Sequence, residues 1–262
     1  MIETIILKSE ALNTNATIDV IRPNTGHVQN LMILLHGNMN PESSVELFHN
    51  LPEELELEAL CDKYHMMTVM PLTRNRYYIS TDDYDCGKYV ASELPDYIKQ
   101  RYELQDSIEI MLAGISMGGY GATLIAAHSQ GLFSKIISLS GAYIAKDVEI
   151  GNPEVWGSLT PNSVDKNTFL HYFLPLSDLK ESTDRNALTA LKLFKEHGER
   201  PKFVVTCGTD DWLYKRNLDF LKELDFYGID YVFNCIDGGN HDPDCFRRGL
   251  WNAVEYFNDT EE

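Results

Sequence analysis

Three residues around position 116 combine a nucleophile with the small neighbours that a sharp turn requires. Gly114, Ser116 and Gly118 fit the pattern G-x-S-x-G. A mostly apolar stretch at 108–113 precedes them, as in a buried strand, and residues 119–124 suit the start of a helix. A serine at such a strand–turn–helix junction stands at the carboxyl end of the strand, with its hydroxyl accessible. The pattern therefore indicates covalent catalysis by Ser116 rather than a glycine-rich turn that only packs closely.

A serine hydroxyl needs a general base, and a histidine late in the chain is placed to serve. In strand–turn–helix sites of this kind the acid and then the histidine follow the serine, so four of the eight histidines come too early. Among the others, His128 ends the helix after the serine, while His171 and His197 lie in a stretch without clear strands. His241 lies in a loop between the last strand and the last helix, where sites form in parallel sheets. We therefore expect His241 to be the base.

The acid that orients the histidine is expected in the loop after the preceding strand, 203–207. That loop contains Asp210 and Asp211. Spacing does not choose between the two, since one of the pair can cap the helix expected from Trp212 onward.

Two backbone N–H groups must stabilise the oxyanion, one of them from the residue after the nucleophile, Met117. The second should come from the loop after an earlier strand, and the strand ending in His36 and Gly37 supplies it through Asn38, with Met39 as the near alternative. We interpret His36 as a hydrogen-bonded anchor of this loop rather than as a base.

The order of apolar runs along the chain predicts an α/β fold that can position these residues. The run 31–36 is apolar without alternation, which is typical of a parallel strand buried on both faces. The first twenty residues alternate and predict an antiparallel pair of strands. Further strands are expected at 66–70, 108–112, 135–139, 202–207 and 231–236, and helices at 52–64, 86–102, 117–128, 213–227 and 243–257. We expect one domain, 1–262, with a mainly parallel sheet, helices on both faces, and a helical excursion at about 141–200 over the carboxyl strand edge.

Composition narrows the classes of partner and compartment. The chain has 262 residues, 44% of them hydrophobic, enough for a sizeable core, and a net charge of −18 that disfavours nucleic acid and anionic membranes. The five cysteines form no CxxC pair, which favours free thiols. With no signal-peptide pattern and no apolar run of membrane-spanning length, we expect a cytoplasmic protein. An interface between copies of the chain could use the first strands or the excursion.

These motifs together resemble the esterase D-like branch of the α/β-hydrolases, the putative-esterase family, which includes tributyrin esterases, S-formylglutathione hydrolases and acetyl-xylan and feruloyl esterases. The resemblance covers nearly the whole chain. It lies in L-L-H-G at 34–37, E-L-P at 93–95, G-I-S-M-G-G-Y-G-A at 114–122, C-G-T-D-D-W-L-Y at 207–214 and G-G-N-H-D at 238–242. It implies an α/β-hydrolase fold, carboxylic-ester substrates and Asp211 as the acid. The residues after His241 and after Gly37 depart from the family pattern, which bears on the substrate more than on the chemistry.

The sequence thus predicts a serine carboxylesterase for small or short-chain acyl esters, acting without a cofactor. From strand-end position, Tyr143, Trp156 and Tyr78 are the candidate substrate-binding residues. The alternatives are a carbohydrate-linked acetyl or feruloyl esterase, an S-formylglutathione-type thioesterase or a peptidase on the same machinery, and an inactive hydrolase fold used for binding. Residues of metal-ligand type gather near His241, but they do not match the spacing of a zinc site.

Overall fold

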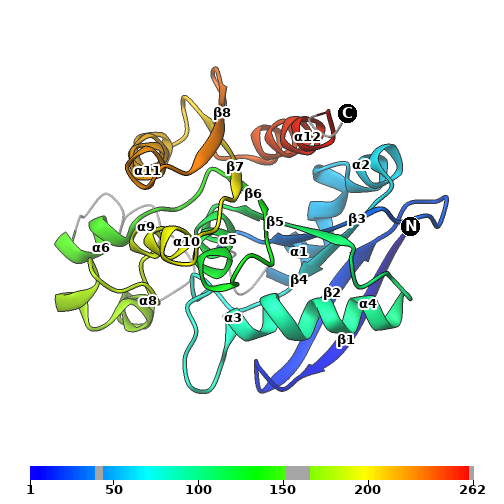
Figure 1. Cartoon of the computed structure of the whole chain (residues 1–262), viewed down its shortest axis with the longest axis horizontal. Coiled ribbons are helices and arrows are strands. Elements are labelled where there is room, and N and C mark those ends of the chain that lie inside the picture. The colour runs from blue at the N-terminus through cyan, green and yellow to red at the C-terminus, as the bar shows by residue number, and fades with distance from the viewer. Residues whose placement is uncertain (39–43, 152–165, 260–262) are drawn as a thin grey trace.

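The computed structural model describes residues 1–38, 44–151 and 166–259. Its centre is a mixed sheet in the order β1-β2-β4-β3-β5-β6-β7-β8 (Figure 1). The strands are β1 (Ile2–Ser9), β2 (Thr14–Ile21), β3 (Asn30–Leu35), β4 (Met66–Pro71), β5 (Glu109–Ile115), β6 (Lys135–Leu139), β7 (Lys202–Gly208) and β8 (Asp230–Ile236). β1 pairs antiparallel with β2, and β2 pairs antiparallel with β4. The remaining neighbours, in the order β4-β3-β5-β6-β7-β8, are parallel. The α/β fold, the antiparallel start and the parallel centre are as the sequence predicted.

Strand β3 shows how one apolar run serves two cores. Successive side chains of a strand point to opposite faces. Leu31, Ile33 and Leu35 accordingly pack in one hydrophobic cluster, whereas Met32 and Leu34 pack in the other, and all five are fully buried. The run lacks polar residues at alternate positions because helices cover both faces of the sheet at this strand.

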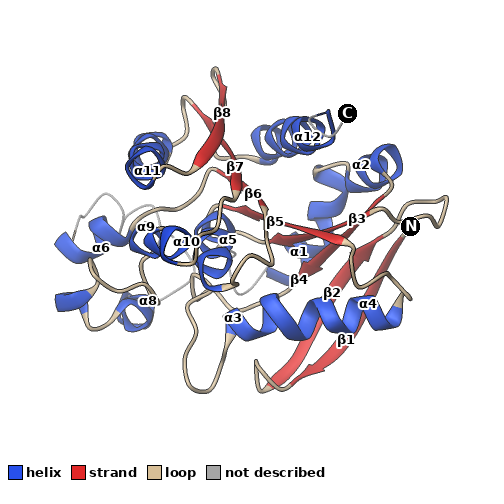
Figure 2. Ribbon diagram, in the orientation of Figure 1, coloured by secondary structure: helices blue, strands red, loops and turns tan. Residues whose placement is uncertain are grey.

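The helices divide between the two faces (Figure 2). They are α1 (Ser44–Glu54), α2 (Leu57–Tyr64), α3 (Cys86–Lys88), α4 (Leu94–Arg101), α5 (Met117–His128), α6 (Ala145–Ile150), α8 (Lys166–Phe173), α9 (Ala187–Ala190), α10 (Lys192–Glu196), α11 (Tyr214–Tyr227) and α12 (Pro243–Asp259). Apolar residues of α1, α2 and α12 fill one cluster, and those of α4, α5, α10 and α11 fill the other. Within the described residues, none of the helices is both long enough and apolar enough to cross a bilayer.

Two expected helices are divided in the structure, the first against expectation and the second as a kink or restart at Pro95 would predict. The helix expected at 52–64 is instead α1 and α2, separated at Glu56, whose φ of 54° is left-handed. This break lets Leu55 and Leu57 both reach the core, where both are fully buried. The helix expected at 86–102 contains a π-helical turn (Tyr89–Glu93), after which Pro95 lies at the start of α4, where its missing N–H costs little.

The described part of the 141–200 excursion is helical, as expected. It contains α6, α8, α9, α10 and a 3₁₀ turn (Leu176–Asp178), and α9 and α10 contact α5. The excursion thus covers the helix that begins immediately after Ser116.

Candidate active site

Ser116 lies at the junction of β5 and α5 in a strained conformation. Its φ is 54° and its ψ is −112°, a backbone region that residues with a side chain rarely adopt. Two hydrogen bonds hold it there, because its N–H donates to the Leu139 carbonyl at 2.8 Å and its carbonyl accepts from the Ala142 N–H at 2.9 Å. Neighbouring strand β6 therefore stabilises the turn that presents the hydroxyl.

The glycines on either side of Ser116 are required by close backbone approach. A Cβ at Gly114 would lie 2.0 Å from the Gly118 carbonyl oxygen, and one at Gly118 would lie 2.2 Å from the Leu35 carbonyl oxygen. Side chains at these positions would force β3, β5 and α5 apart.

The structure brings His241 and Asp211 into line with Ser116. His241 Nε2 lies 3.1 Å from Ser116 Oγ, and His241 Nδ1 lies 2.8 Å from Asp211 Oδ2. Since an ionised carboxylate only accepts, Nδ1–H is the donor and Nε2 is left to accept the serine proton. Asp211 is held in turn by the Leu213 N–H, which donates to its Oδ1 at 2.8 Å.

The two neighbouring aspartates that spacing could not separate occupy different environments. Asp211 is buried beside the imidazole, whereas Asp210 is exposed and its N–H donates to the Gly239 carbonyl. Burial alone would raise the pKa of Asp211, but the hydrogen bond and charge of His241, with the Leu213 N–H, outweigh burial and lower that pKa below its ordinary value. Asp211 therefore stays ionised.

His36 anchors the loop that approaches the nucleophile. Its Nδ1 lies 2.6 Å from the Gly37 carbonyl oxygen, and its Nε2 accepts from the Thr73 N–H at 3.0 Å. Full burial lowers the pKa of His36, although the backbone hydrogen bonds to Gly37 and Thr73 act in the opposite direction. The anchored loop brings Gly37 so close to the nucleophile that a Cβ on Gly37 would lie 3.3 Å from Ser116 Cβ.

A small hollow lies beside Ser116, the expected nucleophile, and includes the expected oxyanion residue Asn38. Its volume is about 200 Å³, and its lining is mostly apolar. It is formed by Gly37, Asn38, Leu51, Glu54, Ile115, Ser116, His241, Pro243 and Phe246. Met117 is the first residue of α5, so its N–H has no carbonyl partner in an earlier turn of the helix. Met39 lies outside the described residues.

Two aromatic rings that the sequence analysis did not single out contact the histidine. The edges of Trp212 and Phe246 meet the imidazole of His241, with ring centroids 5.7 Å and 5.1 Å away. The sequence contained one indication of these contacts. Trp212 directly follows Asp211, and Phe246 lies one helical turn after Pro243, close to His241 in the chain. These rings limit the orientations open to the imidazole.

The expected substrate-binding residues do not line this hollow. Tyr143 is buried, stacks on Phe220 at 3.8 Å between centroids, and lies 2.9 Å from the Ser138 and Thr123 hydroxyls. Tyr78 is buried and donates to the His36 carbonyl oxygen. Both residues follow strands of the parallel sheet, but their side chains are buried and take no part in the wall of this hollow. Trp156 lies outside the described residues.

The carboxylates that follow His241 have other partners. Asp242 accepts from the Cys245 N–H at 2.9 Å, and Asp244 pairs with Arg247 at 2.7 Å. Across the described residues, no three His, Cys, Asp or Glu side chains gather as metal ligands would.

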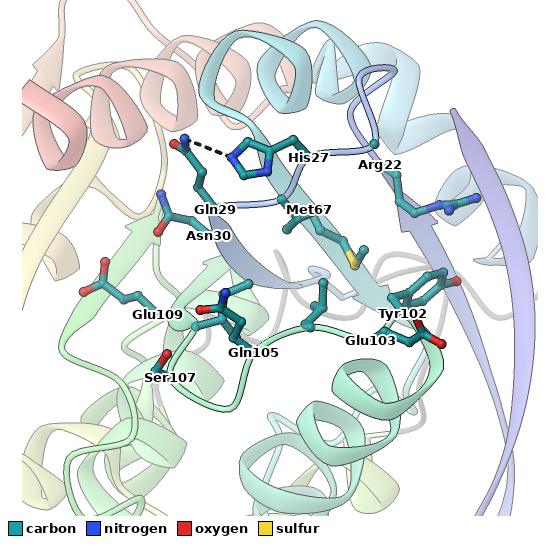
Figure 3. A pocket seen from close by; sticks show the side chains of 14 residues that line it. Arg22, His27, Gln29, Asn30, Met67, Tyr102, Glu103, Gln105, Ser107 and Glu109 are labelled. Atoms are coloured by element: carbon teal, nitrogen blue, oxygen red, sulfur yellow. Dashed lines mark hydrogen bonds between the residues drawn. The ribbon is translucent and has the colours of Figure 1, made fainter.

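A larger hollow lies at the opposite end of the parallel strands (Figure 3). Its volume is about 630 Å³, and it includes Asn30 and Glu109, the first residues of β3 and β5. Because Ser116 follows the last residue of β5, this hollow lies away from Ser116.

Comparison with known proteins agrees with the fold and shows the family. The family described as Putative esterase matches residues 9–257. An acetyl esterase of Caldicellulosiruptor saccharolyticus is 30% identical over 198 residues, which cover 74% of this chain and 72% of that protein. Substrate-bound FphF of Staphylococcus aureus, a fluorophosphonate-binding serine hydrolase, superposes with a TM-score of 0.80 at 20% identity, covering 98% and 97% of the two chains. An S-formylglutathione hydrolase of the same organism gives 0.77 at 22% identity, covering 98% of each chain.

Proposed function

This chain belongs to the putative-esterase family of carboxylic ester hydrolases, and from that premise we propose that it is a serine carboxylesterase for small or short-chain acyl esters. The observation that carries the proposal is the continuous line of polar contacts from Asp211 through His241 to Ser116, at 2.8 Å and 3.1 Å. These contacts give the three groups the relative orientation that nucleophilic catalysis needs.

In the proposed reaction, His241 Nε2 removes the hydroxyl proton as Ser116 Oγ attacks the ester carbonyl carbon. The carbonyl oxygen becomes an oxyanion, which the N–H groups of Asn38 and Met117 stabilise. The imidazolium, paired with Asp211, then donates its proton to the alcohol oxygen, and the carbon–oxygen bond breaks. Water attacks the acyl-enzyme with His241 again as base and releases the carboxylic acid.

The dimensions of the hollow support a small substrate. A volume of about 200 Å³ is below the usual range for drug-sized ligands, and Leu51, Ile115 and Phe246 give it apolar walls. A short acyl chain fits such a space. The relative named acetyl esterase supports the same size class.

A fluorophosphonate probe and a set of nitrophenyl esters from acetate to octanoate test the proposal. We expect one covalent adduct on Ser116, hydrolysis that declines as the acyl chain lengthens, and neither adduct nor hydrolysis in Ser116→Ala. Hydrolysis at the wild-type rate in Ser116→Ala would refute the mechanism. A wild-type protein that neither reacts with the probe nor cleaves any ester would favour the inactive binding fold instead.

A further inference from the structure

Helix α1 places one carboxylate in the wall of the catalytic hollow. Leu51 and Glu54 are three residues apart and so lie on one face of the helix, and both line the hollow that contains Ser116 and His241. Apart from Glu54, the lining residues include one further titratable side chain, that of His241, and no lysine, arginine or aspartate. Glu54 therefore contributes a negative charge to the space that receives the ester.

That charge has no cationic partner among the described residues. The nearby carboxylates of Glu56 and Asp244 both pair with Arg247, at 3.6 Å and 2.7 Å. Arg248 is also directed to Asp244, at 3.9 Å. Glu54 takes part in none of the ion pairs found in the described part of the chain, so the local cations are already engaged by other acids.

We propose that Glu54 is a specificity-determining residue that excludes esters carrying a negative charge near the reacting carbonyl and admits neutral or cationic ones. A second carboxylate entering this hollow would lie close to Glu54, whose side chain is exposed. Repulsion of unit charges under such conditions lowers kcat/KM by about three- to tenfold. The net charge of −18 provides no opposing attraction.

The inference rests on the proposed function and narrows its substrate class. Acetylated sugars are neutral and would be admitted. Glutathione thioesters carry two carboxylates and one ammonium group, so the same wall would disfavour them. Glu54 thus separates two substrate classes that the names of similar proteins leave open.

Two matched ester series test the role of Glu54, one for each side of the ester bond. The first contains nitrophenyl butyrate, nitrophenyl hemisuccinate and nitrophenyl 4-trimethylammoniobutyrate. The second contains the acetate esters of propanol, glycolate and choline. We expect Glu54→Gln to reduce the neutral-to-anionic ratio of kcat/KM by about three- to tenfold in at least one series, and Glu54→Lys to reduce it further. Raising NaCl from 20 to 500 mM should weaken discrimination in the wild type more than in Glu54→Gln.

Glu53→Gln is the matched control, because Glu53 is also an exposed acid of α1 but does not line the hollow. It should keep the wild-type ratio. An unchanged ratio in Glu54→Gln in both series, or an equal change in Glu53→Gln, would overturn the inference. Ser116→Ala separates the two proposals. If Ser116→Ala is inactive while the Glu54 variants keep the wild-type neutral-to-anionic ratio of kcat/KM, only the specificity role of Glu54 fails. If Ser116→Ala is active, the proposed function itself fails.

Discussion

At the residue scale, two adjacent aspartates show how position in the turn determines a role. Only Asp211 faces the imidazole, where its Oδ2 lies 2.8 Å from Nδ1, while the exposed Asp210 uses its N–H to join the loop to Gly239. The side-chain chemistry of the two residues is identical. The two residues therefore differ in the direction in which the side chain points and in how deeply it is buried.

This contrast gives a paired prediction. Asp211→Asn should lower kcat by about 10⁴-fold, because an amide facing Nδ1 favours the wrong tautomer and cannot stabilise the imidazolium. Asp210→Asn should remain within about threefold of the wild type, as expected for an exposed site. Initial rates on nitrophenyl acetate measure both effects. Equal losses in the two variants would contradict the assignment of Asp211.

Sequence reasoning could propose those residues of the candidate site whose roles follow from their order along the chain. Ser116 and His241 could be selected because one motif and the order of the partners exclude other candidates. The choice of Asp211 needed the family resemblance, since depth within a loop leaves no pattern in spacing. The contacts of Trp212 and Phe246 with His241 depend on how α12 packs, and no local pattern reports that packing.

At the element scale, α5 packs so closely against the end of β3 that there is no room for a side chain at Gly118. Gly118→Ala would place a Cβ 2.2 Å from the Leu35 carbonyl oxygen, which is backbone and cannot rotate away. We expect the free energy of unfolding to fall by about 1–3 kcal/mol. Activity should fall as well, because β3 leads into the loop that is proposed to stabilise the oxyanion. Urea unfolding monitored by circular dichroism measures the first effect.

Gly87→Ala is the control for this prediction, since the nearest atoms to a Cβ there are 3.4 Å away, an ordinary contact. Gly87 also lies within α3, where alanine is favoured over glycine by about 1 kcal/mol. If both variants unfolded at the same urea concentration, close packing at Gly118 would not limit stability.

The buried His36 makes the stability of the loop at 36–38, which is proposed to stabilise the oxyanion, sensitive to acid. Because burial lowers the pKa of His36 in the folded protein, the unfolded chain binds a proton that the folded one does not as pH falls below about 6.5. Stability is therefore lost below that pH, by at most about 1.4 kcal/mol per pH unit from this group. His36→Gln should flatten the dependence of the unfolding free energy on pH between 7 and 5.

His27→Gln provides the comparison, because His27 is exposed and lies away from the loop. Its stability profile should follow the wild type across the same range. A His36→Gln profile parallel to the wild type would show that His36 is not held neutral by the fold.

At the scale of the whole molecule, the sheet was predictable because its central strands are buried on both faces and read as unbroken apolar runs. The boundary between α1 and α2 was not, since it depends on Glu56 adopting a left-handed conformation so that two leucines can reach one core. The short helices of the excursion lack long apolar periodicity, so only their helical class could be anticipated. We propose that the excursion folds with the sheet as one unit, since α9 and α10 contact α5 directly.

The reactivity of the cysteines measures whether the core of the whole molecule excludes a thiol reagent in solution. All five are free, and Cys235 is the exposed one. Burial raises the pKa of Cys61 and Cys245 to about 11 and that of Cys86 to about 12, and it also raises the pKa of Cys207. Reaction with Ellman's reagent requires a thiolate that is accessible to it.

At pH 8 the native protein should therefore release about one equivalent of thionitrobenzoate rapidly, from the exposed cysteine, and five in guanidinium chloride. Cys235→Ser should abolish the rapid phase and leave four equivalents on unfolding. Fast reaction of a second thiol in the native protein would contradict a uniformly closed core. If that thiol were Cys245, in the first turn of α12, it would locate the opening beside His241, because local opening exposes the least stable elements first.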